Sequence, residues 1–227
     1  MDQGNGLSAV LFDMDGTLVD SEKTWTLALD ELAARYGGTL SREARVAMVG
    51  TTTDETMAIL HTDLGQPWRD PDEGAHWLDN RVKQLFATDL SFLPGAQELL
   101  RGVRAAGIPT ALVTATAGHI VEVMLGVIGR ENFDVIVTDD EVTYGKPHPE
   151  PYATAAAILG TEPARCVAIE DSPNGIASAR AAGCVVVGVP AEVDLRHVPG
   201  ITLVRSLADV DVAMLRRLVV AAASISR

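Results

Sequence analysis

The sequence is poor in cysteine and in aromatic residues, and both shortages narrow the fold classes open to it. Its 227 residues include only two cysteines, Cys166 and Cys184, too few for the disulfide framework of a small secreted domain. Each cysteine begins an apolar run, so we interpret both as buried free thiols. Aromatic residues make up 4% of the chain against 47% hydrophobic residues, with Ala and Val abundant. This composition fits a packed protein of helices and strands better than a disordered or an all-β one.

Positive charge and long apolar stretches are also scarce. The chain has 18 Lys and Arg against 31 Asp and Glu, a net charge of −13, so we expect neither a nucleic-acid partner nor an anionic membrane partner. No apolar run reaches the length of a membrane span. Residues 1–10 lack the basic start and the apolar stretch of a signal peptide. We therefore expect a cytoplasmic protein.

Short apolar runs rich in β-branched residues alternate with helical patterns over most of the chain. The runs are residues 9–13, 109–115, 133–139, 166–171, 184–189 and 201–204. Each is nearly continuous in apolar residues, as expected of strands covered on both faces. The helical patterns between them are residues 95–107, 118–129, 149–160 and 173–183. This alternation predicts an α/β fold with a doubly wound, mostly parallel sheet.

One segment interrupts the alternation. Between the first and second apolar runs lie four helical patterns and no convincing strand, over residues 22–37, 41–50, 53–65 and 70–90. The simplest interpretation is a helical cap domain, residues 19–90, inserted into a core made of residues 1–18 and 91–227. Chains divided in this way tend to place the active site in the cleft between the two parts.

Two pairs of acidic residues follow predicted strands. Asp13 and Asp15 end the first run, and residues two apart in an extended segment share a face. Glu170 and Asp171 end the fourth run. The carboxyl ends of parallel strands meet at one sheet edge, where open α/β sheets bind ligands, so these carboxylates are expected to gather there. Gathered carboxylates need a counter-charge, and we predict Mg²⁺, the usual hard cation where phosphate is bound.

A hydroxyl and a cation are expected at the same edge. Thr114 ends the segment "ALVT" and offers a hydroxyl together with backbone amides. Lys146 lies in "YGKPHPEPY", where the prolines stiffen the loop that presents it. A lysine among acids would place positive charge on a transferring phosphoryl group.

Four short motifs together resemble those of the haloacid dehalogenase-like (HAD) hydrolase superfamily, in its branch of β-phosphoglucomutases and sugar-phosphate phosphatases with an α-helical cap. They are "DMDGT" (13–17), Thr114, "GKPHP" (145–149) and "EDSPNGIASARAAG" (170–183), and they span nearly the whole chain. The resemblance implies a Rossmann-like core and covalent catalysis through an aspartyl-phosphate.

The resemblance also implies a role for each site residue. Asp13 would attack phosphorus, and Asp15 would protonate the leaving oxygen and then activate water. The expected Mg²⁺ ligands are Asp13, the backbone carbonyl of Asp15, and Asp171, with Glu170 adjacent. The expected phosphoryl ligands are Thr114, its neighbour Ala115, and Lys146.

The superfamily performs several reactions, and the residues favour one of them. Asp15 and the pair Glu170–Asp171 argue against a dehalogenase, which needs no Mg²⁺ and typically lacks the second aspartate. A phosphonatase usually lacks the acid at the Asp15 position. The stronger alternative is a β-phosphoglucomutase-like phosphomutase, whose cap normally supplies a histidine where this chain has Trp25 and an arginine where an ungapped reading gives Thr53.

We therefore predict an Mg²⁺-dependent phosphatase, a phosphoric monoester hydrolase of a small phosphorylated metabolite, with a sugar or polyol phosphate favoured. Trp25, which follows "DSE" at 20–22, is a candidate substrate contact. A non-catalytic module that binds a phosphorylated metabolite is the third hypothesis, and the chain is expected to be a monomer or a homodimer. The sequence singles out no substrate ligand among the basic residues of the cap, Lys23, Arg45, Arg81 and Lys83.

Overall fold

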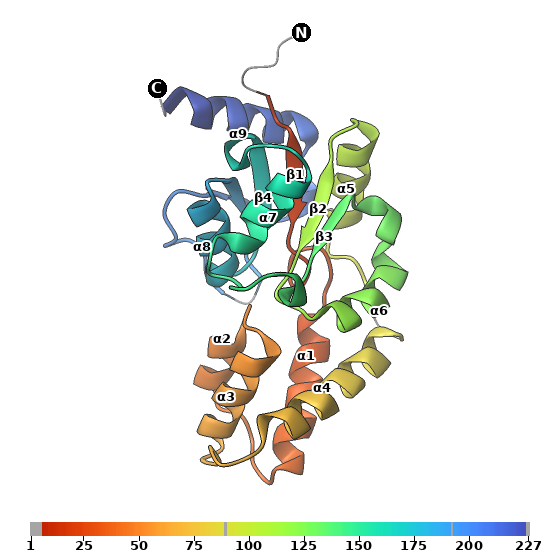
Figure 1. The fold of residues 1–227 in the computed structure, drawn as a ribbon, viewed down its shortest axis with the longest axis vertical. Helices are drawn as coiled ribbons and strands as arrows, with labels where there is room; N and C mark the ends of the chain where they lie inside the picture. The colour runs from red at the N-terminus through yellow and green to blue at the C-terminus, as the bar shows by residue number, and fades with distance from the viewer. Residues whose placement is uncertain (1–5, 89, 192, 226–227) are drawn as a thin grey trace.

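One parallel sheet organises the chain. The structure, a computed structural model, describes residues 6–88, 90–191 and 193–225. In this part of the chain the sheet has six strands in the order β3-β2-β1-β4-β5-β6, all parallel (Figure 1). The strands are β1 (Ala9–Phe12), β2 (Thr110–Val113), β3 (Val135–Val137), β4 (Cys166–Glu170), β5 (Val185–Gly188) and β6 (Thr202–Leu203). Every apolar run predicted to be a strand therefore contains one, although each strand is shorter than its run.

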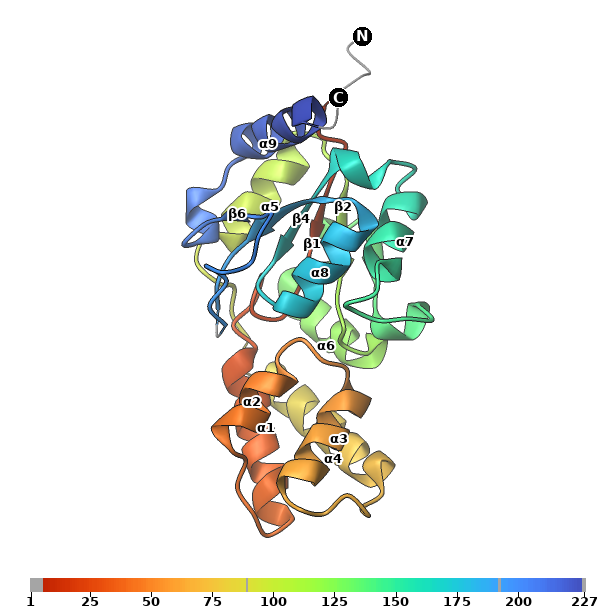
Figure 2. The ribbon, with the colours of Figure 1, turned by 90° about the vertical axis from the view of Figure 1, so that its left-hand side faces the viewer.

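Helices cover both faces of this sheet, as Figure 2 shows. Those that follow the predicted alternation are α5 (Ala96–Ala105), α6 (Gly118–Ile128), α7 (Glu150–Ile158), α8 (Pro173–Ala182) and α9 (Val212–Ile225). Short 3₁₀ turns, which the sequence patterns did not predict, are η1 (Arg130–Asn132), η2 (Asp139–Glu141), η3 (Pro163–Arg165) and η4 (Leu207–Asp209). None of the described helices combines the length and apolarity that crossing a membrane requires.

The buried core lies in two layers, one on each face of the sheet. Val10 and Phe12 of β1 belong to a cluster that includes apolar residues of α5, α6 and α9. Ala9 and Leu11 belong to a second cluster, with residues of α7 and α8. Successive side chains of a strand point to opposite faces, so a strand buried on both sides must be apolar throughout. The predicted fold class, a doubly wound Rossmann-like α/β sheet, is confirmed.

Four helices lie between β1 and α5, at the carboxyl end of the sheet (Figure 1). They are α1 (Glu22–Arg35), α2 (Arg42–Met48), α3 (Thr53–Asp63) and α4 (Pro71–Phe86). The Ser41 hydroxyl accepts a hydrogen bond from an amide in the first turn of α2, and Thr52 and Glu55 form a capping box at the start of α3. The predicted ranges for core and cap also take in residues 1–5, 89, 192, 226 and 227, which lie outside the described residues.

The chain enters and leaves this helical segment at adjacent points. Val19 and Phe92 form an antiparallel bridge. The amide of Leu93 donates to the carbonyl of Leu18 at 2.9 Å, and the amide of Asp20 donates to the carbonyl of Ser91 at 3.0 Å. The two connections therefore run side by side as a short hydrogen-bonded ribbon.

The strand order also determines where a ligand can bind. β2 pairs with one edge of β1 and β4 pairs with the other. The chain therefore adds β2 and β3 on one side of β1, and then β4, β5 and β6 on the opposite side. This reversal opens a crevice beyond the carboxyl ends of the strands, the usual ligand position in open α/β sheets. The helices α1–α4 lie over that crevice.

Two glycines at opposite ends of α5 provide a test of the packing. Gly95 has a φ of 84°, and a Cβ there would lie 2.0 Å from the backbone nitrogen of Ala208. Gly107 has a φ of 68°, but a Cβ there would meet nothing within 4 Å. We expect Gly107→Ala to cost about 1 kcal/mol of unfolding free energy, from backbone strain alone. Gly95→Ala should cost at least about 3 kcal/mol, because the backbone of η4 must also move.

Urea unfolding of both variants and of the wild-type protein measures the two losses. Equal losses at the two positions would show that the contact between Gly95 and η4 is not as close as described.

Candidate active site

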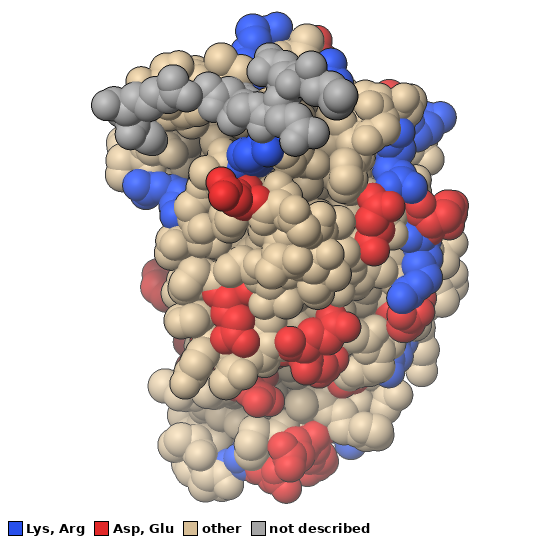
Figure 3. Space-filling view, turned by 45° about the horizontal axis from the view of Figure 1, so that its top comes forward, with Lys and Arg blue, Asp and Glu red and all other residues tan. Residues whose placement is uncertain are grey.

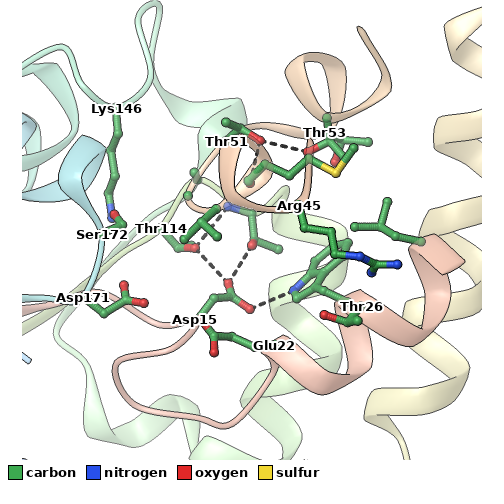
Figure 4. Close-up of a pocket in the computed structure, with 18 of the residues that line it drawn as sticks. Asp15, Glu22, Thr26, Arg45, Thr51, Thr53, Thr114, Lys146, Asp171 and Ser172 are labelled. Atoms are coloured by element: carbon green, nitrogen blue, oxygen red, sulfur yellow. Dashed lines mark hydrogen bonds between the residues drawn. The ribbon is translucent and has the colours of Figure 1, made fainter. Parts of the chain in front are cut away.

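The ends of three strands and one loop bring the predicted site residues together. Asp13 directly follows β1 and Thr114 directly follows β2. Glu170 ends β4, and Asp171 comes next. Lys146 lies in the loop between η2 and α7, and its side chain reaches back to the same sheet edge, as Figure 4 shows. Residues far apart in the sequence thus meet where the parallel strands end.

Lys146 is buried between two carboxylates. Its Nζ donates hydrogen bonds to Asp13 Oδ1 at 2.7 Å, to Glu170 Oε1 at 2.6 Å and to the backbone carbonyl of Val113 at 3.0 Å. Only 5% of this residue is exposed. Burial alone would lower the pKa of the ammonium group, but the charges of Asp13 and Glu170 outweigh burial and raise it. Lys146 therefore stays positively charged.

Glu170 is fully buried behind Lys146. Its Oε1 accepts a second hydrogen bond from the hydroxyl of Tyr152 at 2.6 Å, and its Oε2 accepts one from the hydroxyl of Ser172 at 3.1 Å. Sequence reasoning did not single out Tyr152 or Ser172. Tyr152 had no signal beyond its place in a helical pattern, whereas Ser172 stands at the N-cap of α8, inside the fourth motif.

Three carboxylates form a cluster that can hold a cation. One carboxylate oxygen each of Asp13, Glu170 and Asp171 lies within 4.8 Å of the others. Burial and the charge of Glu170 raise the pKa of Asp13 to about 7, although Lys146 opposes the rise. Burial, then the charges of Asp13 and Glu170, also raise the pKa of Asp171 well above its ordinary value. When all three carboxylates are ionised, Lys146 balances only one of their three charges.

One carboxylate oxygen of the cluster is placed to bind a cation. Asp13 Oδ2 is buried, and no group in the described part of the chain forms a hydrogen bond with it. An unpartnered carboxylate oxygen beside the carboxylate of Asp171 suits a hard divalent cation, which takes oxygen ligands. The residues present thus fit the metal that the sequence predicts.

Asp15 is held by hydrogen bonds from two sides. Trp25 Nε1 donates to Oδ1 at 3.0 Å, and Thr116 Oγ1 donates to Oδ2 at 2.7 Å. The hydroxyl of Thr114 lies farther away, at 3.5 Å from Oδ2, and accepts a hydrogen bond from the amide of Thr116 at 3.1 Å. Figure 4 draws the hydrogen bonds to the Asp15 carboxylate as dashed lines, the one from the hydroxyl of Thr114 among them.

A cavity of about 340 Å³ separates the sheet edge from α1, α2 and α3. The predicted site residues that line it are Asp13, Asp15, Trp25, Thr114, Ala115, Lys146 and Asp171. Glu170 is not part of the wall, because it lies behind Lys146. The cavity is of a size that holds a small metabolite.

The helical segment contributes polar residues to the same cavity. Arg45 of α2 is paired with Asp30 of α1, and Glu22 and Thr26 also face the cavity (Figure 4). The sequence analysis gave none of these residues, nor Thr116, a role in the site. It named Arg45 only as one of four basic residues of the helical segment, because their positions depend on how the helices pack over the sheet.

The fold and the site define an α/β enzyme with an acidic centre suited to a cation. A family model described as haloacid dehalogenase-like hydrolase matches residues 7–183. Hexitol phosphatase B of Escherichia coli (strain K12) is 33% identical over 192 residues, which cover 81% of this chain and 83% of that protein. Fructose-1-phosphate phosphatase YqaB of the same strain is 33% identical over 186 residues, 80% of this chain and 96% of that protein.

Solved structures agree with this fold. CbbY from Rhodobacter sphaeroides, solved in complex with phosphate, has a TM-score of 0.81 at 28% identity, covering 92% of this chain and 99% of that one. A β-phosphoglucomutase from Clostridium difficile has a TM-score of 0.84 at 22% identity over 97% of this chain and 100% of that one, a likeness in fold alone. This chain belongs to the haloacid dehalogenase-like hydrolase family. The predicted enzyme class, a phosphoric monoester hydrolase of that family, is confirmed.

The raised pKa of Asp13 leads to a prediction about stability. In the folded protein this pKa is about 7 against an ordinary 3.8, so keeping the carboxylate ionised opposes folding increasingly as the pH rises between these values. With metal chelated by EDTA, Asp13→Asn should be more stable than the wild type at pH 8, by on the order of 2 kcal/mol. The gain should shrink toward pH 5, where the folded wild type has Asp13 protonated.

Chemical unfolding of both proteins at pH 5 and pH 8 measures this difference. A variant that is less stable than the wild type at pH 8, or a difference that does not change with pH, would contradict the prediction.

Proposed function

We propose that this hydrolase is an Mg²⁺-dependent phosphatase that acts on a small sugar or polyol phosphate through an aspartyl-phosphate. The observation that carries the proposal is the surroundings of Asp13. One of its carboxylate oxygens is bound to Lys146 at 2.7 Å, the other has no partner among the described residues, and the side chain lies in the wall of the cavity. Asp15 stands in the same wall.

In the first step, an oxygen of Asp13 forms a bond to phosphorus while the bond from phosphorus to the ester oxygen breaks. Asp15 gives a proton to that leaving oxygen. Lys146, the hydroxyl of Thr114 and the backbone at Ala115 hold the phosphoryl oxygens. In the second step, Asp15 takes a proton from water, the water oxygen bonds to phosphorus, and Asp13 is released with inorganic phosphate.

The metal ligands would be Asp13, Asp171 and the backbone carbonyl of Asp15. The chemistry that a bound Mg²⁺ supplies there is positive charge, which offsets the clustered carboxylates and the charge that develops on the phosphoryl group. Both oxygens of Glu170 accept hydrogen bonds from protein groups, so its role is to hold Lys146 in place. It also belongs to the cluster with Asp13 and Asp171, where the sequence predicts it as a further metal residue.

Residues 19–90 would act as the cap domain and residues 1–18 with 91–227 as the catalytic core. Support comes from the four helices that lie over the sheet edge and from the paired connections at Val19 and Phe92. The cap supplies the cavity wall opposite the phosphate site. It would exclude bulk water and contact the part of the substrate that leaves.

The charges that line the cavity favour a substrate whose leaving group, the part other than the phosphate, is uncharged. The described residues that line it include only two cations, Lys146 and Arg45, against the carboxylates of Asp13, Asp15, Glu22, Asp30 and Asp171. Both cations are already paired, Lys146 with Asp13 and Arg45 with Asp30. A second phosphate or a carboxylate on the substrate would find no unpaired cation in this wall. Hydroxyl groups would find acceptors in the carboxylates and donors in the threonines.

Two other functions remain as alternatives. A β-phosphoglucomutase-like phosphomutase has a similar fold. It is disfavoured by Trp25 and Thr53, which stand where a mutase has histidine and arginine. A non-catalytic binding module would not need the paired acids Asp13 and Asp15.

We further propose a cytoplasmic enzyme, monomeric or homodimeric, with no membrane or nucleic-acid partner. On the face drawn in Figure 3, acidic side chains gather toward the lower part, and Lys and Arg lie along the upper end and one edge, interleaved with acids. This distribution is unlike the continuous basic surface that binds a polyanion.

A substrate panel tests the proposed function. Phosphate release is measured with Mg²⁺ on hexitol phosphates, sugar monophosphates, a sugar bisphosphate, phosphoglycolate and a nucleotide. We expect kcat/KM for the best sugar or polyol monophosphate to exceed that for the bisphosphate and phosphoglycolate by at least about tenfold, because the unpaired second charge opposes binding. Conversion of β-glucose 1-phosphate to glucose 6-phosphate with a bisphosphate primer, in place of phosphate release, would favour the mutase.

Replacement of the proposed nucleophile provides a second test. Asp13→Asn should lower phosphate release by more than about 10³-fold, because an amide cannot form the acyl phosphate. Circular dichroism checks that the variant is folded. Near-normal turnover in a folded Asp13→Asn protein would rule out the covalent mechanism, and tight ester binding without turnover by the wild type would favour the binding module.

A further inference from the structure

We propose that Trp25 and Thr116 are positioning residues that fix the carboxylate of Asp15 against the leaving-group oxygen. The proposal rests on the proposed function, in which Asp15 is the acid and base. It gives Trp25 a partner within the protein in addition to its place in the cavity wall, and it gives a role to Thr116, to which the sequence analysis assigned none.

Each oxygen of Asp15 has one close donor, and the hydroxyl of Thr114 is a third, more distant donor to Oδ2 at 3.5 Å. The indole N–H of Trp25 reaches Oδ1 at 3.0 Å, and the hydroxyl of Thr116 reaches Oδ2 at 2.7 Å. Both distances are ordinary for hydrogen bonds of their type. Two donors on two oxygens fix the plane of the carboxylate, whereas one donor would leave it free to turn. Asp15 is therefore held in a single orientation at the wall of the cavity.

The two donors come from opposite sides of the cavity. Trp25 lies in the first turn of α1, and its ring packs edge-on against Phe86 of α4, with ring centroids 5.8 Å apart at 74°. Thr116 lies in the core, in the loop between β2 and α6. α1 begins two residues after Asp20, whose amide is bonded to the core segment at Ser91. The orientation of Asp15 thus depends on the position of the helices α1 and α4 over the sheet.

Loss of this positioning has a chemical signature. A sugar or polyol leaves as a strongly basic alkoxide unless it receives a proton, so its departure depends on a well-placed acid. p-Nitrophenol leaves readily as its anion and needs no proton. A variant in which Asp15 is less well fixed should therefore hydrolyse a sugar or polyol phosphate more slowly and p-nitrophenyl phosphate at nearly the wild-type rate. A side chain that only supports the fold, or only packs against substrate, would not separate the two esters in this way.

The experiment measures kcat/KM of the full-length enzyme with Mg²⁺ on D-sorbitol 6-phosphate and on p-nitrophenyl phosphate. This ratio covers the steps up to departure of the leaving group, so it reports the acid role of Asp15. Trp25→Phe keeps the ring against Phe86 and removes the N–H. We expect it to lose about 10- to 100-fold with D-sorbitol 6-phosphate and less than about threefold with p-nitrophenyl phosphate.

Position 116 offers a matched pair of variants. Thr116→Val preserves the shape of the side chain and removes the hydroxyl. It should therefore show the same selective loss of kcat/KM that is expected for Trp25→Phe. Thr116→Ser keeps the hydroxyl and should retain most of the wild-type activity on both esters. The contrast between valine and serine separates the hydrogen bond to Asp15 from packing of the loop.

A double variant and a contact control complete the design. In an Asp15→Asn background, Trp25→Phe should add less than about a further twofold loss with D-sorbitol 6-phosphate, because there is no acid left to position. His119 of α6 is bonded to Asp79 of α4 at 2.7 Å, away from Asp15. His119→Gln therefore weakens another contact between α4 and the core. It should change kcat/KM for both esters by the same factor.

The outcomes distinguish this proposal from the function on which it rests. Three outcomes would each overturn the positioning role. Trp25→Phe could lose activity equally on the two esters, or it could cause the same fold-loss in the Asp15→Asn background as in the wild type. Thr116→Ser could also lose as much activity as Thr116→Val. A wild-type enzyme that releases phosphate from neither ester would overturn the proposed function instead.

Discussion

A buried ammonium group between two buried carboxylates is the interaction on which the rest of the site depends. Without Lys146, the carboxylates of Asp13 and Glu170 would be buried with like charges facing each other, at a cost of several kcal/mol per ion. Lys146 balances only part of the charge, because Asp171 joins the same cluster. Ionising the remaining carboxylates opposes folding, and the same negative charge favours binding of a cation. Stability and chemistry are therefore opposed at this sheet edge.

The sheet makes this cluster possible by simple geometry. Asp13, Thr114 and Asp171 follow three adjacent parallel strands, so their side chains gather although 158 positions separate Asp13 from Asp171. The strands themselves are apolar on both faces and held by helices on each side, which leaves little room for movement. The rigid half of the site thus comes from the core, whereas α1–α3 complete the wall opposite.

The difference between site residues at strand ends and site residues on the packed helices explains what could be predicted from the sequence. Asp13, Asp15 and Lys146 were identified because each lies in a short motif next to a strand, and both motif and strand pattern are local. The strands proved shorter than their apolar runs because pairing ends before the apolar residues do. Thr116 was missed because its partner Asp15 lies 101 positions away. Arg45 could not be chosen from the four basic residues of the helical segment, because a basic residue on a helix is equally compatible with solvent. Its place at the cavity, paired with Asp30 of α1, depends on the packing of the helices.

The short ribbon formed where Val19 bridges to Phe92 has a consequence for how such a protein can change over evolutionary time. Because the chain leaves and rejoins the core at neighbouring points, the order and register of the strands do not depend on the length or shape of what lies between. A helical segment of different size could occupy this place while the sheet and its carboxylates stay as they are. The helical segment can therefore change in sequence and length without disturbing the sheet edge, provided that it still presents a hydrogen-bond donor to Asp15 as Trp25 does.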